Sequence, residues 1–301
     1  MSWKHPSNTL SDQQLFRDEI VYSGSMVWIG TFNCHCSHNM FGGVHCFPGH
    51  HLIVFPRTTV KLTMQGKGAI LGSLNSVIFY NHNTIYKRQQ INDEWDLCDY
   101  FQFSHALLFE ILSIYDPKAL NRISKPFPFT HTYLTRLNYL RQRQLIQAIF
   151  KTSKSNKLQI DETAIFLLES LLHDSFTARG IKPIAKKKTS KAHRQIAFDV
   201  QALLATRFDE QLSLKQIADE LFVSPYHLSR VFRQQTGWTI HHFLEQIRLR
   251  HAYERLGDYK NNLIQLALEV GYSTHSHFSN AFHRNFGFAP STKYSQTSFE
   301  G

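Results

Sequence analysis

Cysteine and histidine side chains gather in one short stretch near the N-terminus. Its members are Cys34, His35, Cys36, His38, His45, Cys46, His50 and His51. Thiolate and imidazole groups are the ligands that zinc and other borderline-soft metal ions take. On an extended strand, Cys34, Cys36 and His38 would share one face, so a metal site is geometrically possible. The spacing matches no standard zinc finger or ribbon, and it lacks the two-His-plus-Glu order of a metal-binding cupin.

Three interpretations of this Cys/His cluster stay open. The first is a metal sensor. The second is a redox switch at Cys34 and Cys36, which we disfavour because cysteines two residues apart on one strand form a strained bridge. The third, which we favour, is a set of ordinary buried cysteines and surface histidines that holds no metal or other cofactor.

A second group of chemically capable side chains follows two tight turns in the last third of the chain. The first set is Tyr226, Ser229, Arg230 and Arg233, and the second is His275, Ser276, His277, Ser279 and Asn280. An arginine can bond both acceptors of a guanine edge, an asparagine can pair with adenine, and serine or histidine can reach base edges or phosphates. The alternative for each position is a solvated surface residue.

The elements that position these residues show clear helix start and stop signals. Ser213 with Gln216 predicts a capping box for a helix over 214–221. Ser224 followed by Pro225 predicts an N-cap and first turn, and that helix stops at Gly237. Thr239 opens a longer helix to about residue 256, Asn262 caps one over 263–270, and Ser273 or Thr274 starts the last, which ends at Gly287.

The two pieces share one internal layout. Each has a short helix with a small residue (Ala218 or Ala267), a tight turn, and a second helix with a buried stripe and a polar face. The stripes are Leu228, Val231 and Phe232 in one piece, and Phe278, Ala281 and Phe282 in the other. This is helix-turn-helix architecture. The spacer helix of about 18 residues spans about 27 Å, which with packing at both ends approaches one DNA turn of about 34 Å.

Residues 194–294 resemble the DNA-binding domain of the AraC/XylS family of bacterial transcription regulators. The resemblance lies in Leu214-x-x-Ile217-Ala218, Ser224-Pro225-x-x-Leu228-Ser229-Arg230-x-Phe232-Arg233, Ala267-x-x-Val270-Gly271-Tyr272-Ser273 and Ser276-His277-Phe278-Ser279-x-Ala281-Phe282. It implies two DNA-reading motifs, at about 213–236 and 262–286, with the nine residues above as DNA contacts. Asn280, Thr274 and Lys293-Tyr294 depart from the usual family residues, which makes the operator sequence harder to infer.

The first part of the chain is predicted to be rich in strands. Short apolar runs at 27–29, 51–55, 60–64, 76–80 and 97–103 are separated by turn residues, which is typical of a sandwich or small barrel. Helical spacing follows from Tyr133, and a second helix is expected from Asp161 to Ala178. Their apolar stripes pack on the sheet or form a dimer contact. We expect a β domain at 1–180, a linker at 181–193 and a helical domain at 194–294.

This order also resembles AraC-type regulators, in which a cupin-like sensing and dimerisation domain precedes the DNA-binding domain. The fold class expected is therefore α+β multidomain. The resemblance implies a cytoplasmic homodimer that binds a double-stranded DNA operator, a small-molecule effector and RNA polymerase, and that acts as a ligand-responsive activator. The alternatives are a constitutive DNA-binding regulator whose first domain only dimerises, and a metal-dependent cupin-type enzyme with a DNA-binding tail. No complete catalytic set is present, so we expect no enzyme.

Charge is consistent with a polyanionic partner but does not establish one. The 33 basic and 23 acidic residues give a formal net charge of +10. Residues 1–100 hold seven of each sign, so the whole surplus lies in the later segments. No run approaches the roughly 18 uncharged apolar residues of a membrane helix, and the N-terminus has no apolar signal core, so we expect no membrane partner.

Overall fold

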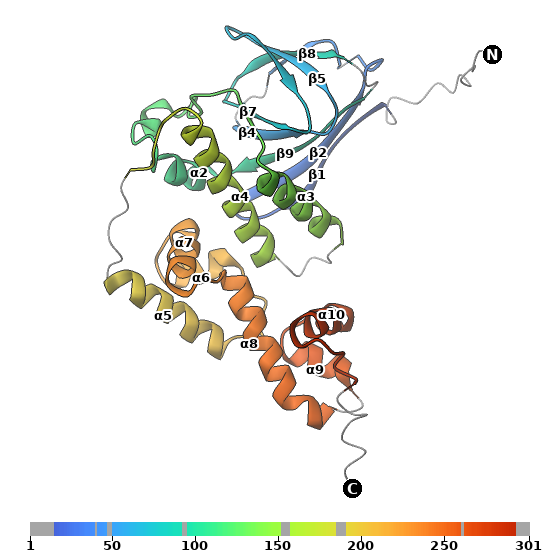
Figure 1. The fold of residues 1–301 in the computed structure, drawn as a ribbon, viewed down its shortest axis with the longest axis vertical. Coiled ribbons are helices and arrows are strands. Elements are labelled where there is room, and N and C mark those ends of the chain that lie inside the picture. Colours follow the sequence, from blue (N-terminus) through green and yellow to red (C-terminus); the bar gives the residue numbers. More distant parts are fainter. Residues whose placement is uncertain are drawn as a thin grey trace, which may run out of the picture. The chain divides into compact units, whose positions relative to one another are not determined.

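The computed structural model describes residues 15–39, 41–46, 50–91, 95–151, 157–184, 191–259 and 262–292. The chain divides into two compact units. Unit 1 comprises Met1–Lys151 and Thr163–Lys186, and unit 2 comprises Thr152–Glu162 and Lys187–Gly301. Unit 1 contains the strands and unit 2 is helical (Figure 1), which confirms the α+β class.

Two antiparallel sheets build unit 1. One has the order β1-β2-β9-β4-β7-β10 and the other the order β3-β8-β5-β6. The strands are β1 (Phe16–Ser23), β2 (Val27–His35), β3 (Val44–Cys46), β4 (Leu52–Pro56), β5 (Val60–Met64), β6 (Ala69–Gly72), β7 (Ser76–Tyr80), β8 (Ile85–Gln90), β9 (Trp95–Phe103) and β10 (His131–Tyr133).

A hydrophobic core forms from four of these strands. It includes Leu52 and Val54 of β4, Leu62 of β5, Ile78 of β7 and Tyr86 of β8. β5 alternates buried and exposed residues, as expected for a strand with one face on the core. β4 and β7 are buried throughout, since both of their faces are covered. All five predicted strand runs lie on observed strands.

Three helices accompany the sheets of unit 1. They are α2 (His105–Leu112), α3 (Arg136–Lys151) and the part of α4 (Lys157–Thr177) from Thr163 onward, and the short turn η1 (Ala119–Arg122) lies between α2 and α3. The fully buried Asp99 of β9 holds α3 to the sheet. Its Oδ2 accepts hydrogen bonds from Gln142 Nε2 and Arg143 Nη1, each at 2.8 Å. Burial raises the pKa of Asp99, and these donors oppose that rise.

Unit 2 is built from six helices and one short 3-10 turn in its described C-terminal part. They are α5 (Lys191–Thr206), α6 (Leu214–Glu220), α7 (Pro225–Thr236), α8 (Ile240–Arg255), η2 (Leu256–Tyr259), α9 (Leu263–Glu269) and α10 (His275–Phe286). Packing between α8, α9 and α10 centres on Leu249, Leu266, Phe278 and Phe282, each no more than 1% exposed.

Several predicted features of the first two thirds need correction. Helix α4 begins at Lys157, so Asp161 is a buried helix residue and not an N-cap. Helix α5 begins at Lys191, inside the predicted linker, while residues 185–190 of that linker lie outside the described residues. Strands β1, β3, β6, β8 and β10 were not predicted; the pattern of β1 and β8 is mostly exposed, so neither shows a continuous apolar run. None of the described helices is long and apolar enough to span a membrane.

Candidate DNA-binding interface

The first helix-turn-helix motif consists of α6 and α7. Ser213 and Gln216 form the predicted capping box at the start of α6. Ser224 caps α7 by accepting a hydrogen bond from the His227 amide, with Pro225 in the first helical turn. Gly237 ends α7 in the left-handed conformation, with φ +77°. These residues could be recognised in the sequence because each of them helps to end the helix where backbone groups have no partner within it.

The second motif consists of α9 and α10 and repeats the same devices. Asn262 caps α9 by accepting from the Gln265 amide, and Thr274 caps α10 by accepting from the His277 amide. Gly287 ends α10 with φ +82°. The choice between Ser273 and Thr274 is thereby settled in favour of Thr274.

The turns of the two motifs are geometrically equivalent. The Val223 amide donates to the Ala218 carbonyl at 3.0 Å, and the Tyr272 amide donates to the Ala267 carbonyl at 2.8 Å. The residue before each donor has positive φ: +55° at Phe222 and +85° at Gly271. Both alanines are fully buried, which lets the two helices of each motif approach closely. The internal repeat inferred from the sequence is therefore present in the backbone.

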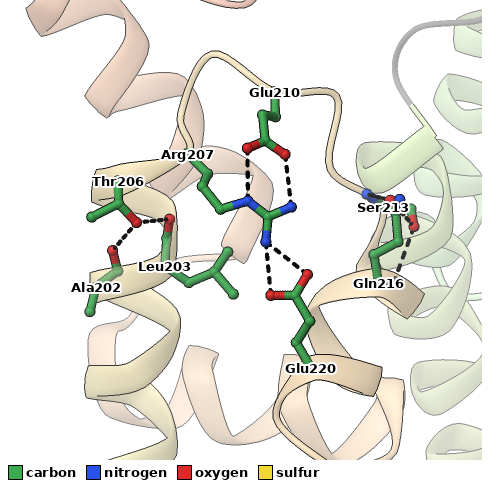
Figure 2. Close-up of polar contacts among 8 residues, drawn as sticks. All are labelled: Ala202, Leu203, Thr206, Arg207, Glu210, Ser213, Gln216 and Glu220. Atoms are coloured by element: carbon green, nitrogen blue, oxygen red, sulfur yellow. Dashed lines mark hydrogen bonds and ion pairs between the residues drawn. The ribbon is translucent and has the colours of Figure 1, made fainter.

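An exposed ion-pair network connects the loop before the first motif to helix α6 (Figure 2). The Arg207 guanidinium, just after α5, bonds the Glu210 carboxylate through Nε and Nη2 at 2.8 and 2.7 Å. Its Nη1 bonds both oxygens of Glu220, at the end of α6, at 2.8 Å. These bonds raise the pKa of Arg207. The fork geometry fixes the loop before Ser213 against α6.

The predicted contacts of the second motif lie on the surface of α10. His275, Ser276 and Asn280 are exposed, and His277 and Ser279 are half-buried. His275 Nε2 and Ser279 Oγ are 3.2 Å apart, within hydrogen-bond distance. Burial lowers the pKa of His277. This helix therefore presents polar side chains and, at Arg284, an exposed cation that also pairs with Glu245 at 2.9 Å.

The predicted contacts of the first motif are placed differently. Tyr226 is 2% exposed and Ser229 is 7% exposed, so neither side chain is available to a base edge in this conformation. Arg230 and Arg233 are half-buried. The Nε of Arg230 is buried without a hydrogen-bond partner, and its guanidinium carbon lies 5.8 Å from the Tyr226 ring centroid. The expectation that Tyr226 and Ser229 lie on an open surface is wrong for this conformation, because other side chains cover them.

The sequence reasoning missed Glu162, the residue that contacts Ser229. Glu162 Oε1 lies 3.3 Å from Ser229 Oγ and accepts from the Ile240 amide at 3.0 Å, while Oε2 accepts from the His241 amide at 2.8 Å. Glu162 is 4% exposed, and burial raises its pKa to about 7. Its contacts lie 67 to 79 residues away in sequence, so no local pattern signals them.

The N-terminal Cys/His cluster forms no metal site within the described part of the chain: no three His, Cys, Asp or Glu groups converge there. Several members have protein neighbours instead. His50 Nδ1 lies 3.0 Å from Gln102 Nε2, and His45 Nε2 lies 3.4 Å from Arg88 Nη2. His51 is buried against aromatic rings, and its pKa is lowered to about 4, mainly by burial. The four cysteines are free thiols.

A separate cavity of about 210 Å³ lies within unit 1. Its walls come from both sheets and are mainly apolar, with Phe32, Leu52, Val54 and Leu62 among them. Three charged residues also line it. Arg88 Nη1 bonds Asp96 Oδ2 at 2.7 Å, with both side chains 6% exposed, and these two charges neutralise each other. The third, Asp18, is an exposed residue whose Oδ1 accepts a hydrogen bond from the Tyr100 hydroxyl at 2.7 Å. The cavity therefore offers an apolar surface with a few polar groups and no unbalanced buried charge.

Comparison with known proteins agrees with the duplicated motif. Residues 217–295 match the family model described as "Helix-turn-helix domain". The melibiose operon regulatory protein of Escherichia coli (strain K12) is 25% identical over 142 residues, which cover 44% of this chain and 45% of that protein. The transcriptional activator RhaS of Shigella boydii serotype 18 is 33% identical over 89 residues, which cover 30% and 32% of the two chains.

These matches show that residues 217–295 form a helix-turn-helix domain of the kind found in AraC/XylS-family regulators. The matches span less than half the length of these curated relatives. Both of these relatives are named as regulators and neither as an enzyme. Among solved structures, fatty-acid-bound ToxT from Vibrio cholerae covers 90% of this chain and 96% of its own, at 12% identity and a TM-score of 0.37.

Proposed function

We propose that this protein is a sequence-specific DNA-binding transcription regulator of the AraC/XylS family. The observation that carries the proposal is the polar, exposed face of α10, held on a doubly capped helix-turn-helix motif whose backbone recurs in α6–α7. Such a helix fits the major groove and presents its first turns to base edges. The 16 residues of α8 span about 24 Å, a rigid spacer between the two motifs.

The proposed roles follow from side-chain chemistry. Asn280 pairs with adenine and Arg230 with guanine, each through two hydrogen bonds. His275, Ser276, His277 and Ser279 reach base edges or phosphates. Tyr226 and Ser229 contribute from α7 once that face is uncovered, and Arg233 contacts the phosphate backbone. For Asn280 the supporting fact is that its side chain is exposed on the motif that is open in this structure.

The test is selection of duplexes from a random pool by the purified full-length chain, followed by fluorescence-anisotropy titration. A selected duplex should bind at least about 1,000-fold more tightly than a scrambled duplex at the same salt concentration. Asn280→Ala should weaken binding, while Asn121→Ala, which removes an exposed asparagine from unit 1, should not. Recovery of no enriched sequence, together with equal affinity for selected and scrambled duplexes, would contradict the proposal.

We also propose that the unit 1 cavity makes the regulator ligand-responsive. The cavity volume of about 210 Å³ lies below the usual range of drug-sized ligand pockets, so the ligand is small. The closed Arg88–Asp96 pair and the apolar walls favour a neutral, largely apolar molecule with one or two hydrogen-bonding groups. A ligand that stabilises one conformation of the chain would shift its DNA affinity.

A thermal-shift screen of small neutral compounds separates this proposal from a constitutive regulator. A true ligand should raise the midpoint of the wild-type chain and not that of Val54→Phe, which fills the cavity. Addition of the compound should then change affinity for the selected duplex. If no compound raises the unfolding midpoint of the wild type, or if one raises the midpoints of both chains equally, the alternative of a constitutive regulator is favoured.

Homodimerisation is proposed to occur through α3, whose outward face carries three apolar side chains among polar ones. Leu137, Leu140 and Phe150 are 62%, 41% and 64% exposed, while the buried positions of this helix include Asn138 and Gln142. Apolar side chains at this exposure suit a symmetric helix–helix contact. Sedimentation equilibrium should give a dimer for the wild type and a monomer for Leu137→Glu/Leu140→Glu. Activation through RNA polymerase stays a prediction from the family resemblance.

A further inference from the structure

The two recognition helices differ in exposure although their backbones correspond. Counted from the N-caps Ser224 and Thr274, Tyr226 matches Ser276 and Arg230 matches Asn280. Ser276 and Asn280 are exposed, whereas Tyr226 is buried and Arg230 is half-buried. Along the whole of α7 the exposed position is Gln234, near the C-terminal end. The half of α7 that would enter a major groove is therefore covered, and the corresponding half of α10 is open.

The cover over α7 includes a segment distant in sequence. Residues 157–162, which we call the covering segment, are the first six residues of α4 and belong to unit 2. Four of them, Leu158, Ile160, Asp161 and Glu162, are buried. Glu162 supplies the contact with Ser229, on the face of α7 predicted to read DNA. Unit 2 thus holds its own first recognition helix against a carboxylate.

The Glu162 carboxylate is bound by well-oriented donors. The Ile240 and His241 amides are the first two of α8, and they would otherwise lack partners inside that helix. The third amide, of His242, is already paired with the N-cap Thr239 at 3.1 Å. The positive end of the α8 dipole favours an anion at this position. Glu162 therefore completes the cap of α8 while it contacts α7, so the covering segment is fixed to both helices.

We infer that the covering segment is an autoinhibitory element, in which Glu162 closes the DNA-reading face of α7 while leaving α10 open. This inference rests on the proposed function. In the closed state the chain engages DNA through α10 alone. Withdrawal of Glu162 frees Ser229, and we expect the face of α7 that also carries Tyr226 and Arg230 to open, so that a second major-groove segment is read. The covering segment continues as α4 to Thr177 in unit 1, so the chain connects it directly to that unit.

The test uses the full-length chain and a duplex selected by that chain. Glu162→Ala removes the carboxylate but keeps a strong helix former in α4. Glu254→Ala, which removes an exposed carboxylate from α8, is the control for charge and composition. Each chain is prepared with and without Arg230→Ala, and affinity is measured by fluorescence anisotropy at fixed salt. Hydroxyl-radical footprinting of the same complexes reports how many groove segments are protected.

The expected result is a conditional effect of Arg230. In the wild-type and Glu254→Ala chains, Arg230→Ala should change affinity less than twofold. In the Glu162→Ala chain it should weaken binding at least fivefold, and the footprint should extend by one further groove segment. Circular dichroism and hydrogen exchange check folding: amides of α7 and α8 should stay protected as in the wild type, apart from those of Ile240 and His241.

Other outcomes separate the two proposals. If Arg230→Ala costs the same in all backgrounds and footprints are equal, the covering segment is only structural and the inference fails, while DNA binding stands. If no chain binds a selected duplex in preference to a scrambled one, the proposed function itself fails. If Glu162→Ala loses protection throughout α7, Glu162→Lys is used, because its cation at the α8 N-terminus repels the covering segment without shortening the side chain. An unextended footprint in that folded variant also overturns the inference.

Discussion

Phe222 should be replaceable by glycine with a gain in stability. It occupies the turn of the first motif with φ +55°, a conformation that costs an L residue roughly 1–2 kcal/mol. Its ring is 94% exposed, so its removal sacrifices almost no buried area. The equivalent position of the second motif is Gly271. The first motif therefore carries backbone strain that the second avoids.

The magnitude follows from comparing Phe222→Gly with Phe222→Ala. Both remove the ring, but alanine keeps the Cβ that makes positive φ unfavourable. Glycine relieves about 1–2 kcal/mol of strain and costs about 0.5–1 kcal/mol in unfolded-state entropy. The glycine variant should therefore be more stable than the alanine variant by roughly 0.5–1 kcal/mol, which corresponds to a midpoint difference of about 2–4 °C. Gly271→Ala should lower the stability, because alanine is strained at this positive φ and its Cβ would also lie 2.9 Å from the Arg248 guanidinium.

The assay is urea and thermal unfolding followed by far-ultraviolet circular dichroism, whose signal is dominated by the helices. Equal m-values among the variants are required, so that midpoint changes report stability. The reasoning is refuted if Phe222→Gly is no more stable than Phe222→Ala. It is also refuted if Gly271→Ala is as stable as the wild type.

Two further predictions rest on titration and salt. Because burial raises the pKa of Glu162 to about 7, above that of an unfolded glutamate, its contribution to stability is largest at acidic pH. The free energy of unfolding should fall by about 2 kcal/mol more in the wild type than in Glu162→Gln between pH 5 and pH 7; parallel profiles would contradict this. Arg207→Met removes the exposed network around Glu210 and Glu220, so it should lower the unfolding midpoint at low salt and much less at 1 M NaCl. A decrease in the unfolding midpoint that does not depend on salt would show that packing of Arg207, and not its charge, stabilises this region.

The helical unit could be predicted from the sequence in unusual detail because its signals are local. Ser213, Ser224, Thr239 and Asn262 each cap the helix that they were expected to cap. A cap satisfies backbone groups within three residues, so the sequence itself displays it. The buried stripes of α7 and α10 follow from helical periodicity for the same reason.

The strands and the covered recognition face could not be predicted in this way. β8 contains the exposed Ile85 and Lys87 and the buried Arg88, whose charge is paired with that of Asp96 on β9. Glu162 was one acidic residue in an amphipathic helix, and its partners follow more than sixty residues later. The exposure of Ser229 depends on that long-range contact. Residue type and spacing on α7 alone therefore predicted an exposed Ser229, whereas the side chain is buried.

The most direct test of the central claim is a base-preference map for Asn280. Affinity is measured for the full-length wild type and for Asn280→Ala against every single-base variant of the selected duplex. If α10 reads bases, Asn280→Ala should lose about 1–3 kcal/mol on the preferred sequence and lose discrimination at one A·T pair, with the other positions unchanged. An unchanged map, or a uniform loss across all duplexes, would contradict base reading by α10.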